Sequence, residues 1–193
     1  MIVQHIKILS LGLGLMASLS ACGAHDVAEL RGRDIDPSNF RGAVAEEYRK
    51  FVTFEADEMM DWPDANYFAA KALKVLNDPA EVKPEDYSKW NVDEQFLNDL
   101  EVGDKRLRVA MRLFEPEESA QDLARAITSF DCWIEQVEEG WQTNHIAACQ
   151  AAFNDALRGV EAKKGIEITD GGEAKVRLVV HHDLDQSNRV LMI

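Results

Sequence analysis

The residues best suited to metal chemistry lie near the C-terminus, in the run His181-His182-Asp183-x-Asp185. Imidazole nitrogens and carboxylate oxygens are ligands for zinc and other divalent ions. On a β-strand, however, neighbouring side chains point to opposite faces, so His181 and His182 do not readily hold one ion together. We therefore predict a degenerate strand and turn with no metal site. A metal or ligand site in this His-rich tail is the alternative.

Two further groups of residues are acidic. The first surrounds Trp62 and consists of Asp57, Glu58, Asp61 and Asp64. The second consists of Glu135, Glu138 and Glu139. Acid–base catalysis needs two carboxylates with separated pKa values in a cleft, but solvated helix surfaces explain both groups more simply. The sequence has no glycine-rich phosphate loop, no GxSxG and no HExxH. We predict a protein that is not an enzyme and nominate no catalytic residue and no cofactor.

Cys22 follows a segment typical of export. Residues 1–21 contain one basic residue, Lys7, and an apolar run shorter than the roughly 20 residues of a membrane span, so we predict a signal peptide. The run ends in Leu19-Ser20-Ala21-Cys22, which is similar to the bacterial lipobox, in which cleavage precedes the cysteine and its thiol accepts a diacylglycerol. We predict lipidation of Cys22. An ordinary secretory signal with a chance cysteine, or a buried N-terminal helix, is the alternative.

Cys132 and Cys149 lie at nearly equal distances from a predicted turn at Gly140. At 1.5 Å rise per residue they fall at almost the same level of a helical hairpin, so we predict that they form a disulfide. Cys132 points away from the apolar stripe of its own helix. The bridge therefore requires this helix to lie between the rest of the bundle and the next helix, with Ser129 and Gln136 beside the bridge.

Apolar residues at three- and four-residue steps predict a mainly α protein with about five helices in antiparallel hairpins. These helices run from Ser38 to about Met60, from Pro63 to Leu76, from Asp93 to Phe114, from Pro116 to the Gly140 stop, and onward from the Thr143 cap. The first pair resembles one tetratricopeptide-type hairpin, but no 34-residue period recurs. Gly103 weakens the third helix by about 1 kcal/mol relative to alanine. The four tryptophans are expected in the core or as hairpin anchors.

The helical domain is predicted over residues 38–161, between two simpler regions. Residues 22–37 have glycine, charge and no sustained period, which predicts a flexible tether. Residues 162–193 are predicted to form a short β tail, with strands on either side of Asp170-Gly171-Gly172. Val176, Leu178 and Val180 alternate as one buried strand face. Because a lone hairpin is marginal in water, we expect this tail to be loosely packed.

Composition restricts the partners. The 193 residues include 21 lysines and arginines and 35 acids, and loss of Lys7 with the signal peptide leaves 20 basic residues against the same 35. Such a surface repels nucleic acid and anionic lipid headgroups, so neither is an expected partner. The length fits one domain. With Cys22 assigned to lipid, the other two of the three cysteines make the even number that a disulfide needs.

Two segments carry a resemblance to a known family: FEADEMMDWPDANYFAAKAL from Phe54 and FDCWIEQVEEGWQTNHIAAC from Phe130. The helical part resembles the N-terminal region of OmpA-family lipoproteins of alphaproteobacteria, over roughly residues 1–160. In that family a peptidoglycan-binding domain follows, and residues 179–187 are similar to its opening strand and turn. The family's TDxxGxxxxNxxLSxxR motif is missing here, so the tail is interpreted as the truncated start of that domain and peptidoglycan binding is not expected.

The leading functional prediction is therefore a non-catalytic lipoprotein whose Cys22 anchors a helical domain in the periplasm. Gly23 is not the aspartate that retains enterobacterial lipoproteins in the inner membrane, so the resemblance implies the outer membrane. The domain would have an envelope-structural role or bind another envelope protein. The alternative is a periplasmic metal-binding, ligand-binding or enzyme-accessory protein that uses the His-rich tail.

Overall fold

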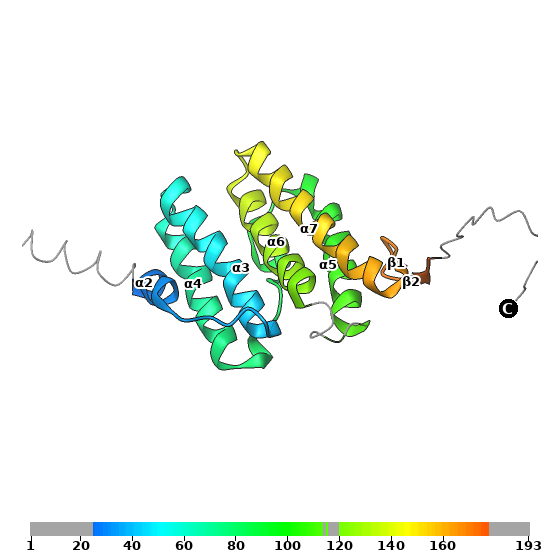
Figure 1. Cartoon of the computed structure of the whole chain (residues 1–193). Coiled ribbons are helices and arrows are strands. Elements are labelled where there is room, and N and C mark those ends of the chain that lie inside the picture. Colours follow the sequence, from blue (N-terminus) through cyan, green and yellow to red (C-terminus); the bar gives the residue numbers. More distant parts are fainter. Residues whose placement is uncertain (1–24, 114, 116–119, 178–193) are drawn as a thin grey trace, which may run out of the picture.

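A computed structural model describes residues 25–113, 115 and 120–177 (Figure 1). These residues form six α-helices and one two-stranded sheet, which confirms the mainly α fold. The elements are α2 His25–Gly32, α3 Phe40–Phe54, α4 Trp62–Asn77, α5 Glu94–Leu113, α6 Ala120–Glu139, α7 Thr143–Lys164, β1 Ile166–Ile168 and β2 Ala174–Val176. No helix among these residues is both long enough and apolar enough to cross a membrane.

Helix α2 corrects the prediction of a flexible tether over residues 22–37. Val27 and Leu30 are buried, and Ile35, just after the helix, is buried as well. Val27 and Leu30 lie three residues apart, so both fall on one helical face, and this face packs against α4. An eight-residue helix is marginal alone and depends on this packing.

Helices α3 and α4 form the first antiparallel hairpin (Figure 1). The N-cap of α3 is Asn39, one residue after the predicted Ser38, because its side-chain oxygen accepts a hydrogen bond from the Gly42 amide at 3.0 Å. At the other end, α3 continues as a π-helical turn, η1 (Glu55–Met59), and Met60 then adopts a left-handed conformation with φ 58°. Asp61 caps α4 by accepting from the Asp64 amide.

Helix α6 lies between α3 on one side and α7 on the other, as the cysteine positions required (Figure 1). Helix α5 covers another part of α6, and Gly103 allows their close approach. A Cβ at Gly103 would lie 2.9 Å from Phe130 Cε2 and 3.0 Å from Trp133 Cζ3. The glycine that weakens α5 locally is thus required by packing against these two rings.

The turn between α6 and α7 contains Gly140 at φ 76°, which confirms the predicted helix stop. Thr143 is not the cap, however. Helix α7 begins at Thr143 and its N-cap is Gln142, whose side chain makes no capping hydrogen bond.

Strands β1 and β2 pair antiparallel around the predicted turn, with Ile168 opposite Ala174 and Ile166 opposite Val176. Ile168 is buried, and β1 contacts α5 and α7. Val176 is 77% exposed, so the prediction that it belongs to a buried strand face is wrong. The reason is that the helices cover β1 and leave β2 at the edge. Leu178, Val180 and the rest of the predicted tail lie outside the described residues.

Candidate functional site

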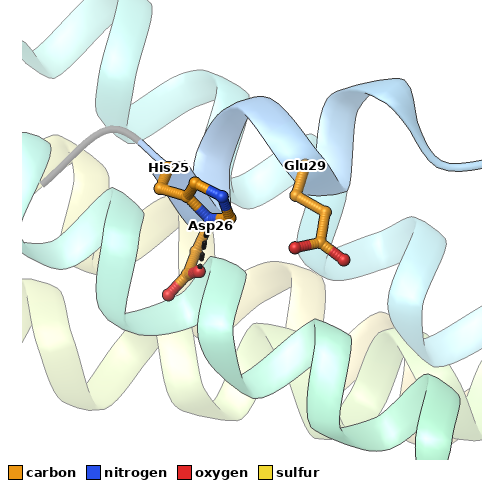
Figure 2. Close-up of side chains that lie close together, drawn as sticks. All are labelled: His25, Asp26 and Glu29. Atoms are coloured by element: carbon orange, nitrogen blue, oxygen red, sulfur yellow. Dashed lines mark hydrogen bonds and ion pairs between the residues drawn. The ribbon is translucent and has the colours of Figure 1, made fainter. Parts of the chain in front are cut away.

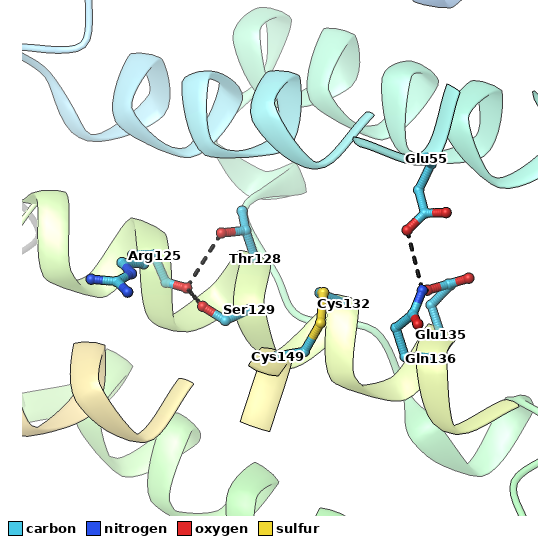
Figure 3. Close-up of a disulfide and its surroundings, with 8 residues drawn as sticks. All are labelled: Glu55, Arg125, Thr128, Ser129, Cys132, Glu135, Gln136 and Cys149. Carbon is cyan, nitrogen blue, oxygen red and sulfur yellow. Dashed lines mark hydrogen bonds between the residues drawn. A yellow bond between two sulfur atoms is a disulfide. The ribbon is translucent and has the colours of Figure 1, made fainter. Parts of the chain in front are cut away.

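The predicted disulfide between Cys132 and Cys149 is present (Figure 3). The two Cα atoms are 5.7 Å apart and the bridge joins α6 to α7. Ser129 and Gln136, predicted to border the bridge, are both buried on α6 one helical turn to either side of Cys132. Cys22 and the pair His181 and His182 lie outside the described residues.

One buried polar network surrounds Asp131 on α6, and we call it the lysine network. Asp131 Oδ2 accepts hydrogen bonds from the Tyr48 hydroxyl at 2.5 Å and from Lys71 Nζ at 2.6 Å. Its other oxygen accepts from the Glu85 backbone amide at 2.7 Å. The Glu85 carboxylate in turn accepts from Lys71 at 2.5 Å and from the Tyr67 hydroxyl at 2.9 Å. Every oxygen of both acids therefore has a donor.

The electrostatics of this network agree with its contacts. Complete burial raises the pKa of Asp131, while Lys71, Tyr48 and the Glu85 amide act in the opposite direction. Burial also opposes ionisation of Glu85, but Lys71 and Tyr67 outweigh it and lower the pKa of this carboxyl. The network is a structural device that joins α3, α4 and the loop after α4 to α6.

A second buried group lies one helical turn further along α6, and we call it the acidic cluster. Its centre consists of Glu55, Glu135 and Gln136, with exposed fractions of 0%, 1% and 0%. The prediction that Glu135 belongs to a solvated face is therefore wrong, because this side of α6 is covered by the first hairpin, chiefly by α3. Glu138 is exposed as predicted, and so are Asp57 and Glu58 of the other acidic group.

In the acidic cluster, Gln136 on α6 joins its neighbour Glu135 to Glu55 in η1 (Figure 3). Gln136 Nε2 donates to Glu135 Oε2 at 2.8 Å and to Glu55 Oε1 at 3.3 Å. Three other oxygens are buried with no hydrogen-bond partner among the described residues: Glu55 Oε2, Glu135 Oε1 and Gln136 Oε1. An unsatisfied buried polar atom costs about 1–3 kcal/mol, so this group is under-satisfied where the lysine network is complete.

Mutual repulsion adds to the effect of burial in the acidic cluster. Burial, followed by repulsion from Glu55, raises the pKa of Glu135 to about 9. Burial, followed by repulsion from Glu139, Asp61 and Asp64, raises the pKa of Glu55 to about 8. Burial of Asp64, followed by repulsion from Asp61, raises the pKa of Asp64 to about 6. No lysine or arginine forms an ion pair with Glu55 or Glu135 among the described residues.

The two segments behind the family resemblance, from Phe54 and from Phe130, meet at the acidic cluster. Glu55 lies in the π-helical turn η1, and Glu135 lies on α6. π-Helical turns are rare and occur frequently at functional sites. In the sequence, the signal was the pair of segments EADEM and WIEQ, each with an acid beside apolar residues. The pairing across two helices could not be read from either segment alone.

A third group consists of His25, Asp26 and Glu29 on α2, whose ligand atoms lie within 4.8 Å of one another (Figure 2). His25 Nδ1 is 3.5 Å from Asp26 Oδ1. His25 and Glu29 are exposed, and Asp26 is half-buried. Helices commonly carry such solvated groups, and nothing else among the described residues indicates a ligand at this one.

An apolar groove crosses the disulfide between α3, α6 and α7. It encloses about 300 Å³, and its lining includes Phe51 and Phe54 of α3, the Cys132–Cys149 bridge and Ala152 of α7.

The tryptophan side chains differ in burial. Trp133 is in the core as predicted, whereas Trp62 and Trp141 are 41% and 72% exposed and so are not core residues.

These arrangements can hold ions or present a surface, but they do not offer a catalytic array. The centre of the acidic cluster is too deeply buried for its carboxylates to touch a substrate, and the acids of the lysine network are fully engaged. We nominate no catalytic residue among those described. No protein-family model, curated protein or solved structure matches the chain.

Proposed function

We propose that this protein is a non-catalytic lipoprotein of the outer membrane. Acylated Cys22 would anchor it, and the helical domain would face the periplasm, with an envelope-structural or protein-binding role. On this proposal the chain is related to the N-terminal region of the OmpA-family lipoproteins that it resembles. The disulfide between Cys132 and Cys149 is the observation that carries the proposal.

The disulfide supports the proposal in two ways. Disulfides persist in oxidising compartments such as the periplasm and are rare in the cytosol. Pairing of these two cysteines also leaves Cys22 as the remaining cysteine of the chain, at the position that the lipobox-like run assigns to lipid.

Surface features support a protein-binding role. The apolar groove over the disulfide is lined by the partly exposed Phe54 and by the edge of the buried Phe51. Trp62 and Trp141 are exposed near the α3–α4 and α6–α7 turns, which lie at the same end of the bundle (Figure 1). Exposed apolar side chains of this size are common at protein interfaces.

Palmitate labelling of the full chain in a Gram-negative host tests the anchor. The wild type should incorporate the label and sediment with outer membranes, whereas Cys22→Ser should remain an unlabelled, uncut precursor. The double variant Cys132→Ser/Cys149→Ser is the matched control and should be labelled normally. Equal labelling of Cys22→Ser and wild type would contradict the proposal.

A photo-crosslinking amino acid at position 141 tests the protein-binding role in cells. We expect a crosslinked partner of the envelope from this position and none from the exposed Glu94 at the start of α5. Crosslinks of equal yield at both positions would contradict a specific interface at the α6–α7 turn. Purified sacculi should not retain the protein.

A further inference from the structure

We propose that Glu55, Glu135 and Gln136 form a binding site for a hard divalent cation of the calcium and magnesium class. The site lies between η1 of the first hairpin and the C-terminal half of α6. It is independent of the lipid anchor and of any protein partner.

The first argument is the unpaired oxygens. Glu55 Oε2, Glu135 Oε1 and Gln136 Oε1 are all buried with no hydrogen-bond donor among the described residues. Buried carboxylates in folded proteins are paired, hydrogen-bonded or bound to a metal ion. Asp131, on the same helix as Glu135, receives a complete set of donors from α3, α4 and the loop after α4, so the shortage at Glu135 is not a general feature of this interface.

The second argument is the type and spacing of the donors. Carboxylate and amide oxygens are the ligands that calcium and magnesium prefer. The terminal amide of Gln136 lies 2.8 Å from one carboxylate oxygen and 3.3 Å from another. A half-turn of this amide exchanges its oxygen and nitrogen and places the Gln136 oxygen at these distances from Glu135 Oε2 and Glu55 Oε1. Neighbouring oxygens around magnesium and calcium are separated by similar distances, about 2.9 Å and about 3.3 Å.

The third argument is the surrounding charge. Asp61, Asp64 and Glu139 lie close enough to raise the electrostatic cost of a negative charge on Glu55. The surroundings of Glu55 are therefore acidic, and a field of this sign concentrates cations. Among the described residues, none of the ion pairs formed by a lysine or arginine reaches Glu55 or Glu135 to supply the missing charge.

The burial of the three central side chains restricts the ligand to a small ion. The three central side chains are at most 1% exposed, so a lysine or arginine of a partner protein could not reach them without separating α3 from α6. A bare or partly hydrated ion needs only small movements of side chains. The surface acids Asp61, Asp64 and Glu139 would hold the outer water molecules of such an ion.

Equilibrium dialysis of the EDTA-treated full chain tests the site, with CaCl₂, MgCl₂ and MnCl₂ used separately at constant ionic strength. We expect at least one of these ions to bind once per chain and to raise the melting temperature. Glu55→Gln and Glu135→Gln should each weaken binding at least tenfold. Glu58→Gln removes one carboxylate from the same π-helical turn, where it is exposed, and should bind like the wild type.

Gln136→Met removes the amide oxygen without changing the net charge, and it should also weaken binding. Circular dichroism of each variant checks that the helices are intact. The proposal is overturned if no ion binds up to about 5 mM, a concentration above the dissociation constants of even weak calcium sites, about 0.1–1 mM. It is also overturned if Glu58→Gln weakens binding as much as Glu55→Gln, because the ion would then respond only to the general acidity of the surface.

Discussion

Asp131 and Glu135 are two acids on one helix with opposite surroundings. They are four residues apart on α6, which places them one turn apart on the same face. Both are buried, at 0% and 1% exposure, and both face the first hairpin. Asp131 accepts hydrogen bonds from Tyr48, Lys71 and a backbone amide, whereas Glu135 accepts one from a single amide nitrogen and is repelled by Glu55.

The difference shows that burial alone does not tell what a buried acid does. At Asp131 the protein supplies a cation and two other donors, so the charge is compensated inside the fold. At Glu135 the nearest residues are acidic or already shared, so the compensation must come from protons or from a bound ion. The first arrangement stabilises the fold, and the second makes it responsive to its solution.

Removal of Lys71 should disrupt the lysine network and have the largest effect on the free energy of unfolding. Lys71→Met leaves the buried Asp131 without its cation, and loss of one partner of a buried pair costs about 3–5 kcal/mol. The free energy of unfolding in urea measures this loss. Lys74→Met, in the next turn of α4 and exposed, is the matched control and should change it by less than about 0.5 kcal/mol. Equal losses in the two variants would show that Lys71 acts only through the net charge.

Loss of the disulfide should have the next largest effect on the free energy of unfolding. It should affect the lysine network and the acidic cluster alike, since Cys132 lies between Asp131 and Glu135 on α6. Cys132→Ser/Cys149→Ser opens a loop with a sequence separation of 17 and should reduce the free energy of unfolding by about 3 kcal/mol. If the double cysteine variant lost stability only when combined with Lys71→Met, the bridge would support the lysine network alone and not the whole α6–α7 hairpin.

The contribution of the acidic cluster to stability should depend on pH. The pKa of Glu135 is about 9 in the folded protein against a reference value of 4.5, so the folded state binds more protons than the unfolded state between these values. Stability from this group is therefore fully present below about pH 4.5 and is lost as pH rises through about 9. Glu55, shifted to about 8, contributes in the same direction.

Glu135→Gln should remove this dependence, since an amide does not titrate. In EDTA we expect the variant to be more stable than the wild type by about 2 kcal/mol at pH 8 and close to it at pH 5. Unfolding curves in urea at the two pH values measure the difference. A variant that is less stable than the wild type at pH 8 would show that the Glu135 carboxylate is already compensated in the folded protein.

A surface acid near the cluster should have the smallest effect. Asp57 forms an ion pair with Arg31 at 2.9 Å, but its side chain is 51% exposed. Asp57→Asn should therefore change the free energy of unfolding by less than about 1 kcal/mol. A larger loss would mean that the contact between α2 and the π-helical turn depends on this pair, and the contrast between buried and exposed acids would then be weaker than we infer.

The sequence by itself determined the helical hairpins and the disulfide. Apolar residues at three- and four-residue steps reported the period of each helix, and Gly140 marked the end of α6 because glycine readily adopts its positive φ. The positions of Cys132 and Cys149 relative to that turn were sufficient to pair them, and even to require that α6 be covered on two sides. These features depend on residues close together in the chain.

Only the tertiary structure decided which acids are buried. The sequence favours a solvated face for Glu135 because the apolar stripe of α6 lies elsewhere, and the pattern of one helix does not report what packs across its back. The sequence predicts a tether over residues 22–37 for a similar reason, since the two buried apolar residues of α2 are too few to predict a helix without α4. Burial is a property of two surfaces, and the second surface at Glu135 comes from Glu55, 80 residues earlier in the chain.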